Sequence, residues 1–203
     1  VPRLVLEPAE AAAMLDAVVA VARALVGARR AMGSSAAEQA LRDEWERFAA
    51  LAGYAFDPGR MDLGRERAGA RARIALDGAP LAIVTEASLE LPRPLGIGLS
   101  VVKRREPAIL DALLGEASVP TGDPRFDEAF FVRGGAGAQR LLGDEGTRRA
   151  IEDLGRAAIG FQLDEARLVA RWGGVIARSE ELARVDAAVE RVRAGMFGGG
   201  EDG

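Results

Sequence analysis

The chain has 203 residues, 49% of them hydrophobic and 29% charged, with a net charge of −4 and a pI near 5.1. This length can bury the core of a globular domain, and the acidic balance gives no overall positive field, so we expect no nucleic-acid partner. Histidine and cysteine are both absent, which excludes disulfides, thiolate or histidine metal sites, and Ser-His-Asp or Cys-His catalysis. We therefore expect no catalytic residue, no metal and no cofactor.

The N-terminal part of the chain predicts a helical hairpin. An apolar stripe over residues 9–31 indicates a largely buried helix, and Asp16 and Arg23 interrupt it, which argues against a membrane span. Ser35 and Glu38 form a capping box for a second helix that ends at Gly53. The stripe of this second helix contains Leu41, Trp45, Phe48 and Ala52.

An alternating pattern then predicts strands. Residues 67–76 alternate apolar side chains with arginines, and residues 81–91 form the next strand. If Leu76 pairs with Leu81, the apolar faces coincide, Arg71 lies opposite Glu86, and Arg67 lies opposite Glu90. A third strand is predicted over 95–103, where Gly96 and Gly98 leave one face bare, and a short helix over 107–115.

The C-terminal half repeats strands and helices. We predict a strand over 128–133, a broken helix over 137–155, a hairpin, and a helix capped by Ser179. In the hairpin, Ile159, Phe161 and Leu163 share a face with Leu168, Ala170 and Trp172; Trp45 and Trp172 are both interpreted as core residues. The last helix has an apolar stripe formed by Leu182, Val185, Val189, Val192 and Met196.

Together these elements predict an α+β fold with a mainly antiparallel sheet of about six strands and helices packed on it. Residues 1–196 are predicted to form one domain, with a possible subdomain seam near 115–125, and residues 197–203 a disordered tail.

The stretch TGDPRFDEAFFVRGG, residues 121–135, contains the first candidate site. Asp123 and Asp127 could bind a divalent cation or act as an acid–base pair. The alternative is a turn whose carboxylates accept hydrogen bonds from nearby amides, because the Thr-Gly-Asp-Pro sequence is typical of turns. We favour the turn.

A glycine-rich turn follows at Gly134, Gly135 and Gly137, between a predicted strand and a predicted helix. That order cradles phosphates in nucleotide-binding folds. However, no Lys-Ser or Lys-Thr pair completes a phosphate loop, and the third glycine of a dinucleotide fingerprint is missing.

Four arginines, Arg65, Arg67, Arg71 and Arg73, form a local basic run. They could bind an anionic surface or an acidic partner. A solvated outer face is the favoured interpretation, because Glu86 and Glu90 would neutralise part of this charge.

One pattern runs through residues 40–196. It comprises Trp45, Ala49, Gly53, Gly64, Gly69, Thr85, Leu99, the TGD triplet at 121–123, Phe126, Asp127, Phe130 and Val132. The pattern resembles a family of uncharacterised bacterial proteins, common in proteobacterial genomes, some of whose members carry hydrophobic segments ahead of this domain. The resemblance implies no reaction, and it implies membrane tethering only through a segment that this sequence does not show.

These observations predict a non-enzymatic, cytoplasmic domain, or one facing the cytoplasm at a membrane, that binds a protein partner or itself. The alternative is a ligand- or nucleotide-binding domain, or a hydrolase, that uses Asp123, Asp127 and the glycines at 134–137.

Overall fold

The computed structural model describes residues 35–78, 83–104 and 118–197. The predicted helices at 9–31 and 107–115 and the predicted tail beyond Phe197 lie outside these residues. The chain divides into two compact units, Val1–Leu41 and Arg42–Gly203. The second unit contains the sheet and the helices packed on it.

Helix α2 (Ala36–Ala52) begins with the predicted capping box. The Glu38 N–H donates to Ser35 Oγ, and the Ser35 N–H donates to the Glu38 carboxylate. The helix ends before Gly53, whose φ of 71° is easily adopted by glycine. Its buried residues are Trp45, Phe48 and Ala49, so the predicted apolar stripe is confirmed at its centre.

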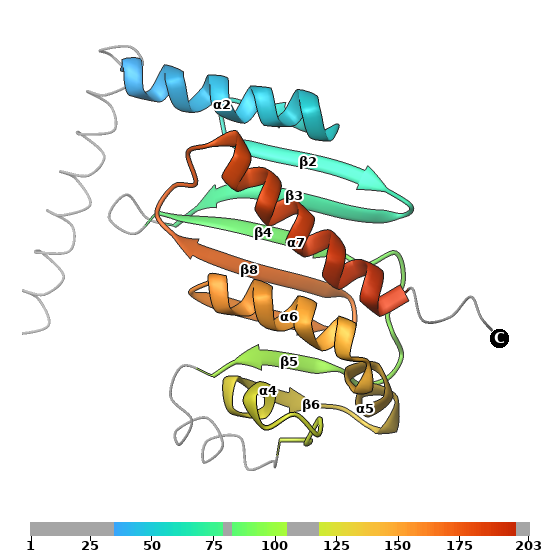
Figure 1. The fold of residues 1–203 in the computed structure, drawn as a ribbon. Helices are drawn as coiled ribbons and strands as arrows, with labels where there is room; N and C mark the ends of the chain where they lie inside the picture. The colour runs from blue at the N-terminus through green and yellow to red at the C-terminus, as the bar shows by residue number, and fades with distance from the viewer. Residues whose placement is uncertain (1–34, 79–82, 105–117, 198–203) are drawn as a thin grey trace, which may run out of the picture. The chain divides into compact units, whose positions relative to one another are not determined.

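Within the described residues, eight antiparallel strands form one sheet, in the order β1-β2-β3-β4-β8-β7-β5-β6. The strands are β1 (Ala55–Asp57), β2 (Asp62–Arg67), β3 (Ala70–Asp77), β4 (Val84–Glu90), β5 (Ser100–Lys103), β6 (Phe130–Arg133), β7 (Gly160–Asp164) and β8 (Arg167–Gly173). The antiparallel α+β class is confirmed (Figure 1). The two strands that sequence reasoning missed are β1 and β2, because β2 (DLGRER) buries only Leu63 and shows no apolar alternation.

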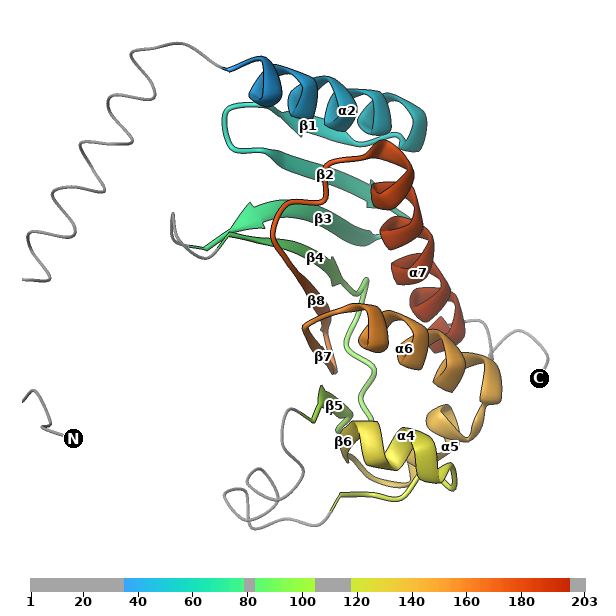
Figure 2. The same cartoon turned by 60° about the vertical axis from the view of Figure 1, so that its left-hand side comes forward.

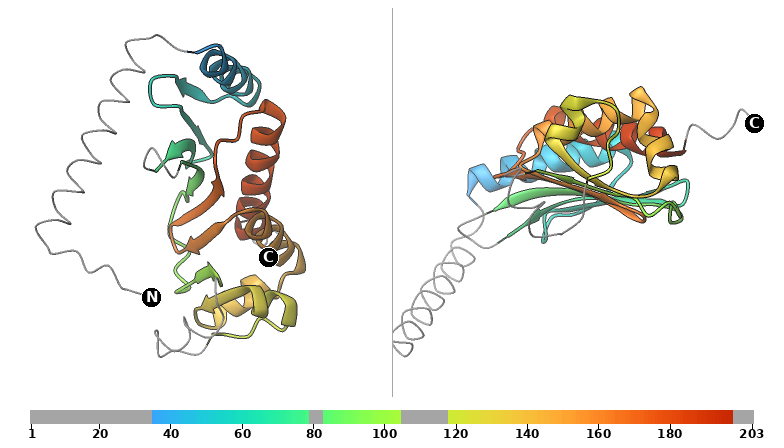
Figure 3. Two further views of the ribbon diagram at one scale, coloured as in Figure 1. Left: turned by 90° about the vertical axis from the view of Figure 1, so that its left-hand side faces the viewer. Right: turned by 90° about the horizontal axis from the view of Figure 1, so that it is seen from below.

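Helices α4 (Pro124–Ala129), α5 (Ala136–Gly143), α6 (Glu145–Ala157) and α7 (Ser179–Phe197) all cover one face of this sheet (Figure 3). The predicted stripe of α7 is confirmed, since its five apolar residues are all buried. The helix also begins at Ser179 as predicted, but its first N–H donates to Glu44 Oε2 at 3.0 Å. A side chain of α2 thus caps α7, and this hydrogen bond lowers the pKa of Glu44 below its ordinary value.

The predicted β3–β4 register is wrong by four residues. Arg71 pairs with Glu90, and Leu76 pairs with Thr85 rather than with Leu81. The alternation of side chains specifies only which face each residue occupies, so a shift by an even number preserves the apolar face and leaves the register open. The predicted strand 67–76 is also interrupted, because Ala68 and Gly69 both have positive φ and turn the chain from β2 into β3.

The predicted strand over 95–103 is correct only from Ser100. Gly96 and Gly98 have φ values of 69° and 68°, which bend the preceding segment into a loop. The N–H groups of Gly96, Ile97 and Leu99 all point at the Glu165 carboxylate, which accepts hydrogen bonds from them. A carboxylate from the β7–β8 turn therefore holds this loop in place.

The C-terminal hairpin is confirmed, with Phe161 paired to Ala170 and Leu163 to Leu168. The predicted break within 137–155 is also confirmed, since Asp144 ends α5 and caps α6 through the Thr147 N–H. The predicted strand 128–133 is shorter, because α4 occupies the residues before Phe130. Within the three described stretches, no helix is long and apolar enough to cross a membrane.

Candidate functional site

Asp123 and Asp127 both accept hydrogen bonds from nearby groups. Asp123 is the N-cap of α4, and its carboxylate accepts from the N–H groups of Arg125 and Phe126. The Asp127 carboxylate accepts from the N–H and the hydroxyl of Thr121, the latter at 2.8 Å. This geometry matches the turn interpretation, although the turn leads into a short helix rather than directly into a strand. Among the residues that the structure describes, no group of three or more acidic side chains could hold a metal ion.

We expect Asp123→Ala and Asp127→Ala each to reduce the free energy of unfolding by about 1 kcal/mol, because each removes acceptors for local donors. Urea unfolding followed by circular dichroism measures this loss. Asp153→Ala is the matched control, since Asp153 is an exposed carboxylate. A rise in melting temperature with Mg²⁺ or Ca²⁺ that both variants abolish would contradict this purely structural role.

The glycines of the predicted phosphate turn allow close packing. A Cβ on Gly137 would lie 2.6 Å from Cγ2 of Ile97, and a Cβ on Gly134 would lie 2.3 Å from Cβ of Ala138. The Gly135 N–H donates to the Ile97 carbonyl. The start of α5 therefore closes directly onto the 96–98 loop, and one of the amides that would bind a phosphate is already hydrogen-bonded.

The four arginines of the predicted basic patch lie on two faces of the sheet. Arg71 pairs with Glu90, and Arg73 pairs with Asp62. Both arginines alternate along β3 with the buried Ala72 and Ile74, so they lie on the opposite face of the sheet from those core residues. Arg65 and Arg67 have the opposite orientation on β2, and only Arg67 is exposed there. The structure therefore does not gather these residues into one anion-binding surface.

Arg65 instead connects β2 with α2 and α7. Its guanidinium donates to the Ala52 carbonyl and to the carboxylates of Asp186 and Glu190, and only 11% of its side chain is exposed. It also lies 4.5 Å from the centre of the Tyr54 ring, whose hydroxyl donates to Asp186. Burial, together with these carboxylates, raises the pKa of Tyr54. The role of Arg65 is structural.

An apolar groove of about 370 Å³ lies between α6 and α7, which run side by side (Figures 1 and 2). We call it the α6–α7 groove; it is lined by Asp153, Leu154, Ala157, Trp172, Ile176, Glu181, Arg184, Val185, Ala188 and Arg191. Trp172 is only partly buried, so it packs less completely than Trp45, which is fully buried. Trp172 occupies the end of β8, where the neighbouring helices leave its ring accessible.

An exposed apolar cluster lies around the end of β8, the strand whose Trp172 lines this groove. Ile83, Ile159 and Val175 are 40%, 54% and 38% exposed, and the only other large apolar side chain so exposed in the described part of the chain is Leu51. The cluster surrounds the end of β8, because the Gly174 N–H donates to the Ile83 carbonyl and the Ile159 N–H to the Arg171 carbonyl. The sequence pattern placed Ile159 on the apolar face of the predicted hairpin. It could not show that the side chain stays exposed in the described part of the structure.

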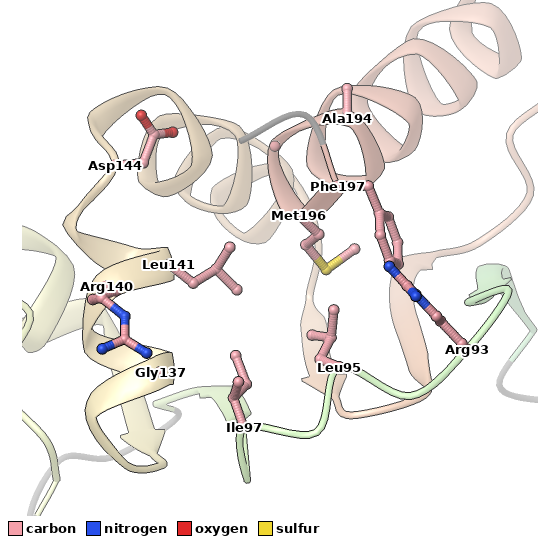
Figure 4. Close-up of a pocket in the computed structure, with 11 residues that line it drawn as sticks. Arg93, Leu95, Ile97, Gly137, Arg140, Leu141, Asp144, Ala194, Met196 and Phe197 are labelled. Carbon is pink, nitrogen blue, oxygen red and sulfur yellow. The ribbon is translucent and has the colours of Figure 1, made fainter. Parts of the chain in front are cut away.

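A second pocket, of about 780 Å³, lies at the other end of α7 (Figure 4). We call it the C-terminal pocket; it is lined by Arg93, Leu95, Ile97, Gly137, Arg140, Leu141, Asp144 and the last four residues of α7, Ala194, Gly195, Met196 and Phe197. Of the site residues predicted from the sequence, only Gly137 lines it. No motif marks the pocket, because its walls come from three segments that are distant in sequence.

No family model matches the chain, and no curated protein matches it. The crystal structure of the mycobacterial trehalose monomycolate transport factor A, TtfA, is similar over 77% of this chain and 94% of that chain, with 11% sequence identity and a TM-score of 0.50. At this identity the likeness concerns the fold alone, and this chain shares an antiparallel α+β architecture with that transport factor.

Proposed function

We propose that this chain is a non-enzymatic domain that binds a partner protein through the α6–α7 groove and the cluster of Ile83, Ile159 and Val175 around the end of β8. The observation that carries the proposal is the position of that cluster. Three of the four strongly exposed large apolar side chains among the described residues lie around the end of β8, where Trp172 lines the apolar groove, and contiguous exposed apolar surface is typical of protein-binding sites.

The occupant that fits this surface is an amphipathic helix of the partner. Two packed helices leave an elongated apolar floor between them, which suits a third helix that inserts its apolar stripe. The rims carry different charges, because α6 contributes Asp153 whereas α7 contributes Arg184 and Arg191 together with Glu181 near its start. Within the described residues Asp153, Arg184 and Arg191 make no ion pair. A helix with basic residues on one flank and acidic residues on the other would pair with both rims.

The remaining observations support a binding role over a catalytic one. The sequence contains no histidine or cysteine, and the two candidate carboxylates accept hydrogen bonds from local groups. The similar solved structure is named as a transport factor, which is a precedent for this fold outside catalysis. We propose that the protein lies in the cytoplasm or at the cytoplasmic face of a membrane. A chain without cysteine has no disulfides that would need an oxidising environment.

The test is fluorescence anisotropy with a labelled 18-residue helix that has a leucine stripe, lysines on one flank and glutamates on the other. We expect saturable binding that Ile159→Asp and Ala188→Glu each weaken at least tenfold, because each places a charge on apolar surface that the helix buries. A scrambled peptide of the same composition should not bind.

Leu51→Asp is the matched control. Leu51 is 80% exposed and lies on α2 rather than at the groove, so this variant should bind the helix like the parent chain. Equal binding by all variants would overturn the proposal. Light scattering provides a second readout: a dimer that Ile159→Asp dissociates would identify a second copy of this chain as the occupant and would overturn the assignment to a partner helix.

A further inference from the structure

We propose that the C-terminal pocket binds a single-chain lipid with an anionic headgroup. The acyl chain lies on the apolar floor, and the two arginines at the rim, Arg93 and Arg140, attract the anionic headgroup. This site lies at the opposite end of α7 from the cluster around β8, and it does not depend on the proposed protein-binding function.

The floor of the pocket is aliphatic. Leu95 and Ile97 come from the loop before β5, Leu141 from α5 and Met196 from α7, and their side chains converge in Figure 4. Gly137 lets Ile97 lie directly against α5, and Glu165 fixes the backbone of the same loop. The floor is therefore formed before any ligand binds, and a volume of about 780 Å³ is within the range of small-molecule sites.

The rim of the pocket carries two arginines. Arg93 and Arg140 lie on opposite sides of the floor (Figure 4), and neither makes an ion pair within the part of the chain that the structure describes. Elsewhere in this unit Arg65, Arg71 and Arg73 are all paired with carboxylates. A guanidinium binds carboxylate or phosphate oxygens through two parallel N–H groups.

The carboxylates near the pocket accept hydrogen bonds from neighbouring groups of the protein. Asp144, which lines it, accepts hydrogen bonds from the hydroxyl and the N–H of Thr147, and these bonds lower the pKa of Asp144. Glu165 accepts three backbone N–H groups of the 96–99 loop. The two guanidinium groups can therefore bind an external anion beside the aliphatic floor. An anionic lipid has both an anionic headgroup for the arginines and an acyl chain for the floor.

The test is isothermal titration calorimetry with dodecanoate and dodecyl phosphate below their micelle concentrations. We expect one site per chain for both probes. Arg93→Gln and Arg140→Gln should each weaken binding roughly fivefold, the upper end for an exposed ion pair. Leu141→Asp should weaken lipid binding at least tenfold, because the new carboxylate lies against the acyl chain and repels the anionic headgroup. Both arginines are exposed, so their variants should keep the parent melting temperature.

Arg178→Gln is the matched control, because Arg178 is exposed just before α7 and outside the pocket. Three further probes separate the alternatives: inorganic phosphate, tetraglutamate and the uncharged dodecyl maltoside. If phosphate or tetraglutamate binds as tightly as dodecyl phosphate, the acyl chain contributes nothing to binding, and the proposed lipid ligand is wrong. Equal binding of dodecyl maltoside, no binding of the anionic probes, or equal losses in Arg178→Gln would overturn the site.

Discussion

Replacing Arg65 with alanine is expected to lower the free energy of unfolding by about 3–5 kcal/mol, the cost of leaving buried charges without their partner. The variant removes donors to the Ala52 carbonyl, to Asp186 and to Glu190 at once. Both carboxylates are mostly buried, with 15% and 23% of their side chains exposed, so water replaces the lost contacts only in part. Urea unfolding followed by circular dichroism measures the loss.

Arg67→Ala is the control for this prediction. Arg67 lies two residues further along the same strand with the same orientation, but it is exposed, and its removal should cost less than about 0.5 kcal/mol. Arg65→Lys should recover only part of the stability, because an ammonium cannot present the planar fork that contacts both carboxylates. A loss below about 1 kcal/mol in Arg65→Ala would show that the cluster contributes little beyond its own desolvation cost.

Replacing Trp45 with alanine is expected to cost about 3–5 kcal/mol, the range for removing a fully buried large aromatic side chain. Trp45 is 0% exposed, its ring centre lies 6.3 Å from that of Phe56, and its indole N–H donates to the Ile176 carbonyl. The side chain thus joins α2 to β1 and to the segment that leads into α7.

Two further variants separate packing from hydrogen bonding. Trp45→Phe keeps an aromatic ring but leaves the Ile176 carbonyl without its donor, which should cost about 1–3 kcal/mol. Trp172→Ala should cost clearly less than Trp45→Ala in the same circular dichroism unfolding experiment, because Trp172 is only partly buried in the α6–α7 groove. Equal losses at both tryptophans would mean that the groove is closed in solution, contrary to the structure.

Sequence patterns predicted the elements whose burial follows a simple period. The stripe of α7 and the paired faces of β7 and β8 are correct because each element buries one face, and that requirement imposes a period of 3.6 or 2 on its apolar residues. Patterns failed at β2, where Leu63 is the only buried residue, and at Gly96 and Gly98, where a positive φ replaces an extended chain. The capping box and the turn at Thr121–Asp127 were predictable because their donors and acceptors are neighbours in sequence.

By itself, the amino-acid sequence determined the α+β class, the orientation of most apolar faces and the exclusion of histidine and cysteine chemistry. Only the tertiary structure decided the register of β3 on β4, the burial of Arg65 beneath α7, the exposure of Ile159, and the position of the partly buried Trp172 in the groove. Both candidate binding surfaces also belong to this second group. The physical reason is distance along the chain: local backbone geometry and periodicity act over a few residues, whereas the partners of Arg65 and the walls of the C-terminal pocket lie dozens of residues apart.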